Sequence, residues 1–196
     1  MEMRIRTCSV ALLLLVQVAV IADEKKSDKD AVEFKAPESW KEFLEFRGSS
    51  LGKWVSEGTT EAIWEGIPGG MKFTGVEEWS LFNGGRNVRS SHEMKTEDGQ
   101  VFSSGSGYSY WDEKTKSVKA DYSGFYTGKP FSGKSTLIGI HGPSNRERWK
   151  HVETSRGKTT EYVIERSVEQ ENRRVNTYRP VSGGKVWRVI SQRANP

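Results

Sequence analysis

One segment of the chain has the residue types and spacing of a phosphate-binding loop. The residues from Gly128 to Ser135 read G-x-x-x-x-G-K-S, a pattern in which backbone N–H groups and a following helix hold nucleotide phosphates. That function requires a helix after the loop, but Gly139 and the pair Gly142-Pro143 interrupt the chain within eight residues of Lys134. We therefore interpret the segment as a glycine-rich hairpin and expect no nucleotide partner.

Three histidines, His92, His141 and His151, are the side chains best suited to bind a metal ion or to transfer a proton. None of them forms an H-x-H or H-E-x-x-H pair, the spacings by which nearby histidines hold zinc. The sequence therefore predicts no metal and no cofactor. His141 alternates with Leu137 and Gly139, which leaves open whether its imidazole points into the interior of the fold.

The residues that can act as nucleophiles lack the sequence context of a catalytic site. The one cysteine, Cys8, lies before an apolar N-terminal run, and no serine stands in a G-x-S-x-G turn. The adjacent carboxylates of Glu77 and Glu78 point to opposite faces of an extended strand, so they cannot cooperate. No catalytic residue is predicted, and whether the protein is an enzyme stays open, with the balance against it.

Aromatic and arginine side chains form the remaining pattern with chemical potential. Arg166 and Arg188 alternate with apolar neighbours, which indicates that both face inward. Buried arginine is costly unless it is paired, and Glu77 is a candidate partner. The predicted ligand-binding residues are Trp79, Tyr108, Tyr110, Tyr122, Tyr126, Arg166 and Arg188. The alternative is that these aromatic residues form only a core and that the arginines lie outside.

The N-terminus has the composition of a targeting segment. Arg4 and Arg6 precede a thirteen-residue run, Val10–Ala22, which is apolar except for one glutamine. This run is shorter than the roughly 20 residues that span a membrane. Residues 1–22 are therefore predicted to be a signal peptide cleaved near Ala22, giving a periplasmic or extracellular protein without a transmembrane span. An uncleaved anchor is the alternative. Residues 23–36 are charged and polar and are predicted to be a disordered leader.

Composition places the remainder, residues 37–196, in one domain. The 30 basic and 26 acidic residues of the full 196-residue chain give a net charge of +4 without a block of one sign, so no nucleic-acid partner is expected. Ser39 and Glu42 form a capping box, which predicts a short helix over residues 39–47. Its position before the first strand predicts that this helix caps one end of the domain.

From residue 51 onward the pattern is that of an all-β domain. Nine clusters of turn-forming residues, from Pro68-Gly69-Gly70 to Ser182-Gly183-Gly184, separate ten segments rich in β-branched and aromatic residues. Short connections make consecutive strands antiparallel neighbours, and closure removes the exposed edges. We therefore predict an up-and-down meander of 8–10 strands closed as a barrel, with a two-sheet sandwich as the alternative. Alternation places Phe102, Ser104, Ser106, Tyr108 and Tyr110 on one strand face, and Val186, Arg188 and Ile190 on another.

A short helix followed by Gly52-Lys53-Trp54 at the first strand resembles the start of the calycins, which include lipocalins and fatty-acid-binding proteins. The resemblance covers residues 51–193 and implies a barrel that holds a small apolar ligand. It implies that Gly52 and Trp54 close the barrel floor, with Arg188 or Arg193 packed against the tryptophan, and that interior arginines can hold a ligand carboxylate. Whether the strand number is of the lipocalin or the fatty-acid-binding type stays open. The rhythm of Glu78-Trp79, Asn83-Gly84-Gly85, Asp98-Gly99 and Tyr110-Trp111-Asp112 looks like the secreted bacterial barrels of domain-of-unknown-function group 1579.

Three functional hypotheses follow from these patterns. The first is an exported barrel that binds a small apolar or amphipathic molecule, and the resemblance to fatty-acid-binding proteins implies a ligand with a carboxylate. The second is a filled barrel that acts through its surface in the bacterial envelope. The third, an enzyme of unknown reaction, is the least favoured.

Overall fold

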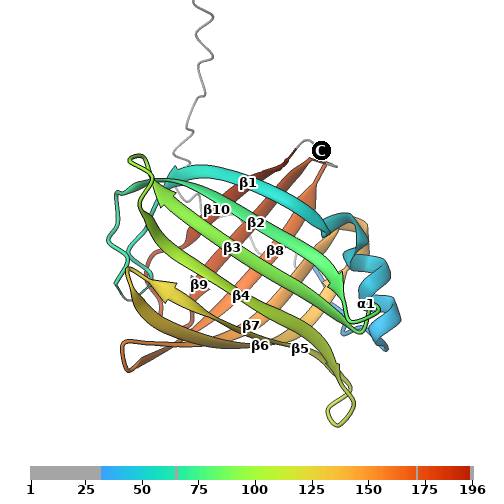
Figure 1. Ribbon diagram of the computed structural model, residues 1–196. Helices are drawn as coiled ribbons and strands as arrows, with labels where there is room; N and C mark the ends of the chain where they lie inside the picture. Colours follow the sequence, from blue (N-terminus) through green and yellow to red (C-terminus); the bar gives the residue numbers. More distant parts are fainter. Residues whose placement is uncertain (1–31, 65, 171, 195–196) are drawn as a thin grey trace, which may run out of the picture. The chain divides into compact units, whose positions relative to one another are not determined.

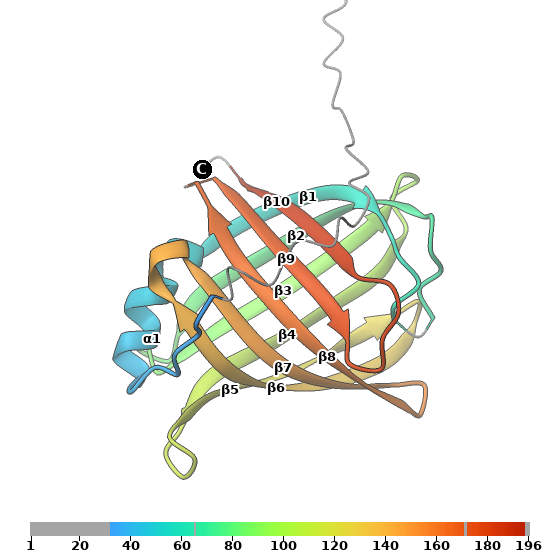
Figure 2. The ribbon, with the colours of Figure 1, turned by 180° about the vertical axis from the view of Figure 1, so that it is seen from behind.

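The computed structural model describes residues 32–64, 66–170 and 172–194. The predicted signal peptide, residues 1–22, and most of the predicted leader lie outside the described residues. The described part is a closed antiparallel barrel in which each strand pairs with its sequence neighbours and β1 pairs with β10 (Figures 1 and 2). The predicted all-β meander with ten strands and a short N-terminal helix is confirmed, and the two-sheet sandwich is excluded.

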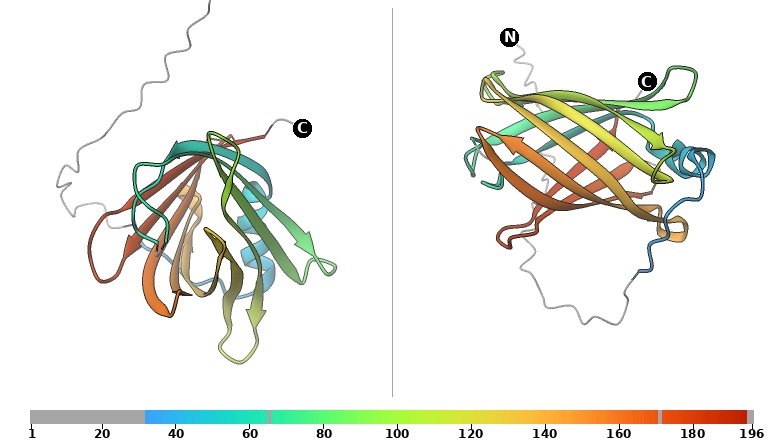
Figure 3. Two further views of the ribbon diagram at one scale, coloured as in Figure 1. Left: turned by 60° about the vertical axis from the view of Figure 1, so that its left-hand side comes forward. Right: turned by 90° about the horizontal axis from the view of Figure 1, so that it is seen from below.

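The strands follow one another around the barrel in chain order, joined mostly by tight turns (Figure 3). The first five strands are β1 (Gly52–Thr59), β2 (Lys72–Phe82), β3 (Asn87–Thr96), β4 (Val101–Asp112) and β5 (Ser117–Tyr126). The others are β6 (Lys129–His141), β7 (Arg146–Ser155), β8 (Lys158–Glu169), β9 (Arg173–Pro180) and β10 (Trp187–Arg193). Single turns of 3-10 helix, Gly48–Ser50 and Gly142–Ser144, follow the helix and precede β7.

The helix α1 (Trp40–Arg47) lies at one end of the barrel (Figure 1). Ser39 caps it by accepting a hydrogen bond from the backbone N–H of Glu42 over 3.2 Å, as the capping box predicts. Phe43 is fully buried and packs edge-on against Trp149 of β7. Because eight residues are too few for a stable isolated helix, this packing against the barrel holds α1 in place.

The barrel floor near α1 is built around Trp54. Its ring is fully buried, its indole N–H donates to the Ser50 carbonyl over 3.0 Å, and the Arg193 guanidinium lies 4.5 Å from its ring centre. Arg193 also donates to the Leu51 carbonyl over 2.7 Å. Gly52 has φ +112°, and a Cβ there would lie 2.9 Å from the Arg193 guanidinium. Of the two arginines that the resemblance offered for this position, the structure therefore places Arg193 there.

Two β-bulges reverse the inward face of a strand; the first overturns an expectation, and the second decides the orientation of His141, which the sequence left open. In β4 a register shift at Met94/Lys95 leaves Phe102 and Ser103 both buried, and the inward residues thereafter have odd numbers. In β6 a shift between Leu137 and Gly139 pairs Gly139 with Arg148 instead of continuing the inward series. An extra residue turns every later side chain to the other face. His141 consequently lies beside Phe34, 6.5 Å between ring centres, rather than in the interior.

Most buried side chains fill the interior of the barrel. One cluster surrounds Phe73, Phe131, Trp149 and Trp187, and a second surrounds Trp54 near α1. Within the described residues, no helix has the length and apolar character needed to cross a membrane. The packed floor and the helix leave the middle of the barrel to a different set of residues, which line a cavity.

Candidate functional site

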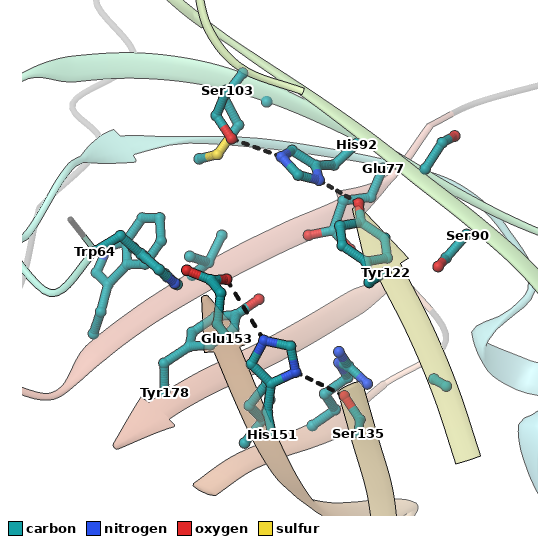
Figure 4. Close-up of a pocket in the computed structure, with 18 of the residues that line it drawn as sticks. Trp64, Glu77, Ser90, His92, Ser103, Tyr122, Ser135, His151, Glu153 and Tyr178 are labelled. Atoms are coloured by element: carbon teal, nitrogen blue, oxygen red, sulfur yellow. Dashed lines mark hydrogen bonds and ion pairs between the residues drawn. The ribbon is translucent and has the colours of Figure 1, made fainter. Parts of the chain in front are cut away.

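The barrel encloses a cavity of about 130 Å³ whose wall combines aromatic rings with polar side chains (Figure 4). Trp64, Trp79, Trp149 and Trp187 supply large apolar surfaces. Glu77, Ser90, His92, Ser103, Tyr122, Ser135, His151, Glu153, Arg166 and Tyr178 supply polar groups. A small number of polar groups within an apolar wall is the usual composition of a ligand pocket.

The structure brings together four of the seven predicted ligand-binding residues. Trp79, Tyr122, Tyr126 and Arg166 line the cavity, and Glu77, the predicted partner for an interior arginine, lies beside them. Their strands keep uninterrupted alternation up to the cavity, so the sequence pattern and the pleat agree.

The other three, Tyr108, Tyr110 and Arg188, do not line the cavity, which corrects the prediction. Tyr108 is 41% exposed, and Tyr110 donates to Asp121 on the outer surface over 2.9 Å, because the β4 bulge turns both outward. Arg188 is exposed because the inward residues of β10 are Trp187, Val189 and Ser191. Ile190 lies on the outer face, so both faces of β10 carry apolar residues and alternation alone selects the wrong one.

A network of buried charges occupies the end of the cavity nearest α1. Glu77 accepts hydrogen bonds from Arg174 over 2.5 Å and from the Trp79 indole over 3.3 Å. Glu147 accepts from Arg47 and, over 3.2 Å, from Arg166. We call these five charged residues, Arg47, Glu77, Glu147, Arg166 and Arg174, the arginine network. It contains one more positive than negative charge.

Electrostatics keep both carboxylates of the arginine network ionised. Burial alone would raise the pKa of Glu77, but Arg174 and Arg166 outweigh burial, and the pKa lies below its usual range. The same balance, with Arg47 and Arg166 as the opposing charges, lowers the pKa of Glu147. The network is therefore a fixed array of charges rather than a proton donor or acceptor at neutral pH.

His92 forms a polar cluster on β3 that carries no charge at neutral pH. Its Nδ1 contacts the Tyr122 hydroxyl, and its Nε2 lies 2.7 Å from the Ser103 hydroxyl (Figure 4). Burial lowers the pKa of His92 to about 4, although Glu77 opposes the shift. Burial also raises the pKa of Tyr122 well above 10. Both groups are therefore neutral hydrogen-bonding partners for a ligand at physiological pH.

His151 forms a second cluster across the cavity, on β7 (Figure 4). Its Nδ1 lies 2.8 Å from the Ser135 hydroxyl of β6, and its Nε2 lies 3.5 Å from a carboxylate oxygen of Glu153. The same oxygen accepts a hydrogen bond from the Tyr126 hydroxyl over 3.0 Å. Serine, imidazole and carboxylate are thus connected in series at the cavity wall.

A loop between β1 and β2 supplies an aromatic cover at the end opposite α1. Trp64 of this loop lies 4.3 Å from Trp187 and 5.1 Å from Tyr178, measured between ring centres. The Tyr162 hydroxyl donates to the Ile63 carbonyl over 2.9 Å and holds the loop down. Burial raises the pKa of Tyr178 to about 12, so its hydroxyl stays protonated.

Sequence reasoning missed the residues of the two histidine clusters. The sequence shows no metal-binding spacing around His92 and His151, and it presents Ser135 only as part of a nucleotide-binding pattern. Strand alternation could have identified His92 as an inward residue, because it continues the inward series of Val88 and Ser90 on β3. Cross-strand pairing, which alternation cannot supply, places Ser135 opposite His151.

The arrangement can hold a small ligand, present hydrogen bonds to it and move protons, but it offers no preformed metal site. Among the described residues, no group of three His, Cys, Asp or Glu side chains is placed to hold a metal ion. Comparison with known protein families and with curated proteins finds no match to this chain. The closed antiparallel barrel is consistent with the calycin type in general.

Proposed function

We propose that the barrel binds one small, partly apolar molecule in its interior cavity. The observation that carries this proposal is a space of about 130 Å³ lined by aromatic rings together with hydroxyl, imidazole and charged groups. An apolar cavity of about 150 Å³ is large enough to bind benzene. The space therefore suits a ligand the size of one aromatic ring or a short chain, oriented by a few polar contacts.

The charge distribution favours an amphipathic ligand that carries a carboxylate. Arg166 lies on the cavity wall and belongs to the arginine network, which has one excess positive charge. A ligand carboxylate facing Arg166 would neutralise that charge in a site shielded from water. Glu153 lies on another part of the wall and repels an anion. The apolar or hydroxyl-bearing end of the ligand therefore points toward the histidine clusters.

The first experiment is native mass spectrometry of the protein purified from its producing cells, compared with the denatured protein. A bound molecule adds mass that disappears on denaturation, and the difference gives the mass of the ligand. The stripped protein is then titrated with benzoate, phenol and benzylamine, which share a ring and differ in charge. We expect benzoate to bind best. A protein that carries no added mass and binds none of the three compounds contradicts the proposal.

Two matched pairs of variants locate the binding. Ala120→Phe fills the cavity and should abolish binding, whereas Ser123→Phe adds the same ring to the outer face of β5 and should not. Arg166→Met should weaken benzoate binding more than tenfold, a loss of at least about 1.4 kcal/mol, with little effect on phenol. Arg188→Met removes an exposed arginine and is the control. If Arg166→Met and Arg188→Met change benzoate binding equally, the proposal that the ligand carries a carboxylate is refuted.

A second candidate is a structural barrel that acts through its outer surface. Phe82 and Tyr108 are 48% and 41% exposed, and their rings lie 5.3 Å apart. An exposed apolar group of this kind is typical of protein contacts. If Phe82→Ser abolishes capture of an envelope component while Ala120→Phe leaves capture intact, the surface hypothesis is favoured over ligand binding.

We also propose that the chain is exported and that it belongs with the secreted barrels of group 1579. The support is the short basic and apolar N-terminal run and the turn and aromatic pattern of the domain. N-terminal sequencing of the protein from separated cell fractions is the test. A periplasmic or extracellular product that begins near Asp23 would support export, and a full-length cytoplasmic product would refute it.

A further inference from the structure

We propose that Ser135 is a nucleophile that accepts acyl groups, and that the cavity hydrolyses small carboxylic esters. This inference rests on the proposed function, because the ester must occupy the same cavity as the bound molecule. The residues that carry it are Ser135, His151 and Glu153, all three of which line the cavity. Their side chains are arranged as nucleophile, general base and the group that orients the base.

The hydrogen-bonding partners assign the tautomer of His151. Glu153 carries only acceptor oxygens when ionised, so the nitrogen that faces it, Nε2, holds the proton. Nδ1 is then the acceptor for the Ser135 hydroxyl, 2.8 Å away. In this state the imidazole is ready to take the proton of Ser135. The resulting imidazolium faces the Glu153 carboxylate, which stabilises its charge.

Neighbouring residues fix all three groups in position. Ser135 and His151 are direct cross-strand partners on β6 and β7, and Glu153 lies two residues beyond His151 on the same face. The Tyr126 hydroxyl holds the carboxylate of Glu153. Gly133 leaves room for the imidazole, since a Cβ at that position would lie 2.4 Å from Cε1 of His151. The geometry thus depends on two rigid strands rather than on a loop.

A second serine–histidine pair in the same cavity lacks this arrangement. Ser103 lies 2.7 Å from Nε2 of His92, but the other nitrogen of His92 contacts the hydroxyl of Tyr122. The Glu77 carboxylate is hydrogen-bonded to Arg174 instead. An imidazolium at His92 would therefore depend on a carboxylate that an arginine already holds. Reactivity is expected at Ser135 and not at Ser103.

The proposed reaction has two steps. Oγ of Ser135 forms a bond to the ester carbonyl carbon, and its proton passes to Nδ1 of His151. The bond from that carbon to the alkoxy oxygen breaks, and the alkoxide leaves as an alcohol with the same proton. Water then attacks the acyl-serine, transferring a proton to Nδ1. Collapse releases a carboxylic acid and returns that proton to Ser135. The cavity volume restricts the acyl group of the substrate to a short chain, as in the aryl acetates.

The test combines covalent labelling with turnover. The full-length protein as purified is treated with a small alkyl fluorophosphonate, which modifies activated serines, and the site is mapped by peptide mass spectrometry. Turnover is followed with 4-nitrophenyl acetate. We expect one adduct, at Ser135, and a loss of labelling and turnover of at least about 100-fold in Ser135→Ala and His151→Gln. Ser132→Ala, on the outer face of β6, is the matched control and should retain both.

Glu153 acts through His151, so it is a positioning residue and needs a different readout. Glu153→Gln keeps the shape of the side chain but removes the charge that stabilises the imidazolium. It should lower kcat at least about tenfold while KM for 4-nitrophenyl acetate changes less than twofold. A variant that raised KM and left kcat unchanged would show that Glu153 only shapes the cavity, and would overturn its assigned role.

The outcomes separate this inference from the proposed function. Labelling of lysines alone overturns the catalytic assignment. Equal labelling of the Ser135→Ala and Ser132→Ala variants also overturns it. Binding of benzoate without any serine adduct also overturns it, and leaves ligand binding standing. Failure of both benzoate binding and labelling overturns the two proposals together. Circular dichroism of each variant shows whether a loss of activity reflects unfolding.

Discussion

The two sides of the cavity differ in how they handle charge. The arginine network holds five charged side chains near α1, in which Glu147 pairs with Arg47 and Arg166, and Glu77 pairs with Arg174. Arg47 and Arg174 are 1% and 2% exposed. The histidine clusters on β3 and β7 contain hydroxyls and imidazoles that can exchange protons. Both regions place polar groups inside one barrel, but ion pairs hold the first together and hydrogen bonds between hydroxyls and imidazoles hold the second.

This difference gives the arginine network a structural role and the histidine clusters a chemical one. Ion pairs buried out of water are costly to form, and removal of one partner leaves an uncompensated charge. The arginine network therefore fixes the floor of the barrel and supplies a constant positive potential. The histidine clusters contribute less to stability, because each of their hydrogen bonds is worth about 1 kcal/mol. Their groups remain available to a ligand.

The largest predicted effect is the loss of a carboxylate from the arginine network. Glu147→Gln leaves Arg47 and Arg166 facing each other without a negative charge between them. We expect the free energy of unfolding to fall by about 3–5 kcal/mol, as measured by urea titration. His151→Gln, in the other region, should cost only about 1 kcal/mol.

An exposed ion pair provides the control for Glu147. Glu165→Gln breaks the pair with Arg148 on the outer side of β7 and β8, where both side chains reach solvent. This change should cost less than about 1 kcal/mol. Equal losses for Glu147 and Glu165 would contradict the assignment of a structural role to the arginine network.

The second prediction concerns the pH dependence of stability. His92 has a pKa of about 4 in the folded protein, below the value of 6.5 for a free histidine. The unfolded chain therefore binds more protons between these values, and stability falls as pH decreases from about 6.5 to 4. The full shift corresponds to about 3 kcal/mol. Urea titrations at pH 7, 5.5 and 4 measure it.

Replacement of His92 isolates its contribution. His92→Gln should remove most of the loss between pH 6.5 and 4, because no imidazole is left to take up the proton. His141→Gln, at the outer side of the sheet beside Phe34, should keep the wild-type profile. Should the wild-type and His92→Gln proteins show the same pH profile, burial of a neutral imidazole at this position would be refuted.

The sequence predicts the barrel better than it predicts the cavity, and the reason lies in particular residues. Ten strand segments with short turns leave few alternatives to a meander, so strand order follows from chain order. Tyr122 and Arg166 were predicted correctly to line the interior because their strands alternate without interruption. Tyr108 was misplaced because a bulge adds one residue, which composition does not reveal, and a second bulge decides the orientation of His141 that alternation left open.

Cross-strand register accounts for most of what the sequence could not supply. Ser135 and His151 are sixteen positions apart and meet only because β6 and β7 pair in one register. A shift of one residue would turn one of the two outward. For Arg188 the alternation pattern itself is ambiguous, because apolar residues lie on both faces of β10 and do not show which face is inward. Chemistry that depends on pairing is therefore visible only in the folded barrel.

The smallest predicted effect tests the space reserved for His151. In Gly133→Ala the new methyl group would lie 2.4 Å from Cε1 of the imidazole, so the ring must move away from Ser135. The cost in stability should be only about 1–2 kcal/mol, because the side chain can rotate into the cavity. Turnover of 4-nitrophenyl acetate should fall much further, since the 2.8 Å contact between Nδ1 and Oγ is lost.

Gly142→Ala is the matched control, because a Cβ at that position has no heavy atom within 4 Å. It should leave stability and turnover unchanged. If Gly133→Ala lowers stability and turnover in the same proportion, its effect is general damage to the barrel. If the free energy of unfolding falls only slightly while turnover falls strongly, the reaction depends on the position of the His151 imidazole. That outcome would distinguish the histidine clusters from the arginine network, in which displacing a charged side chain also destabilises the fold.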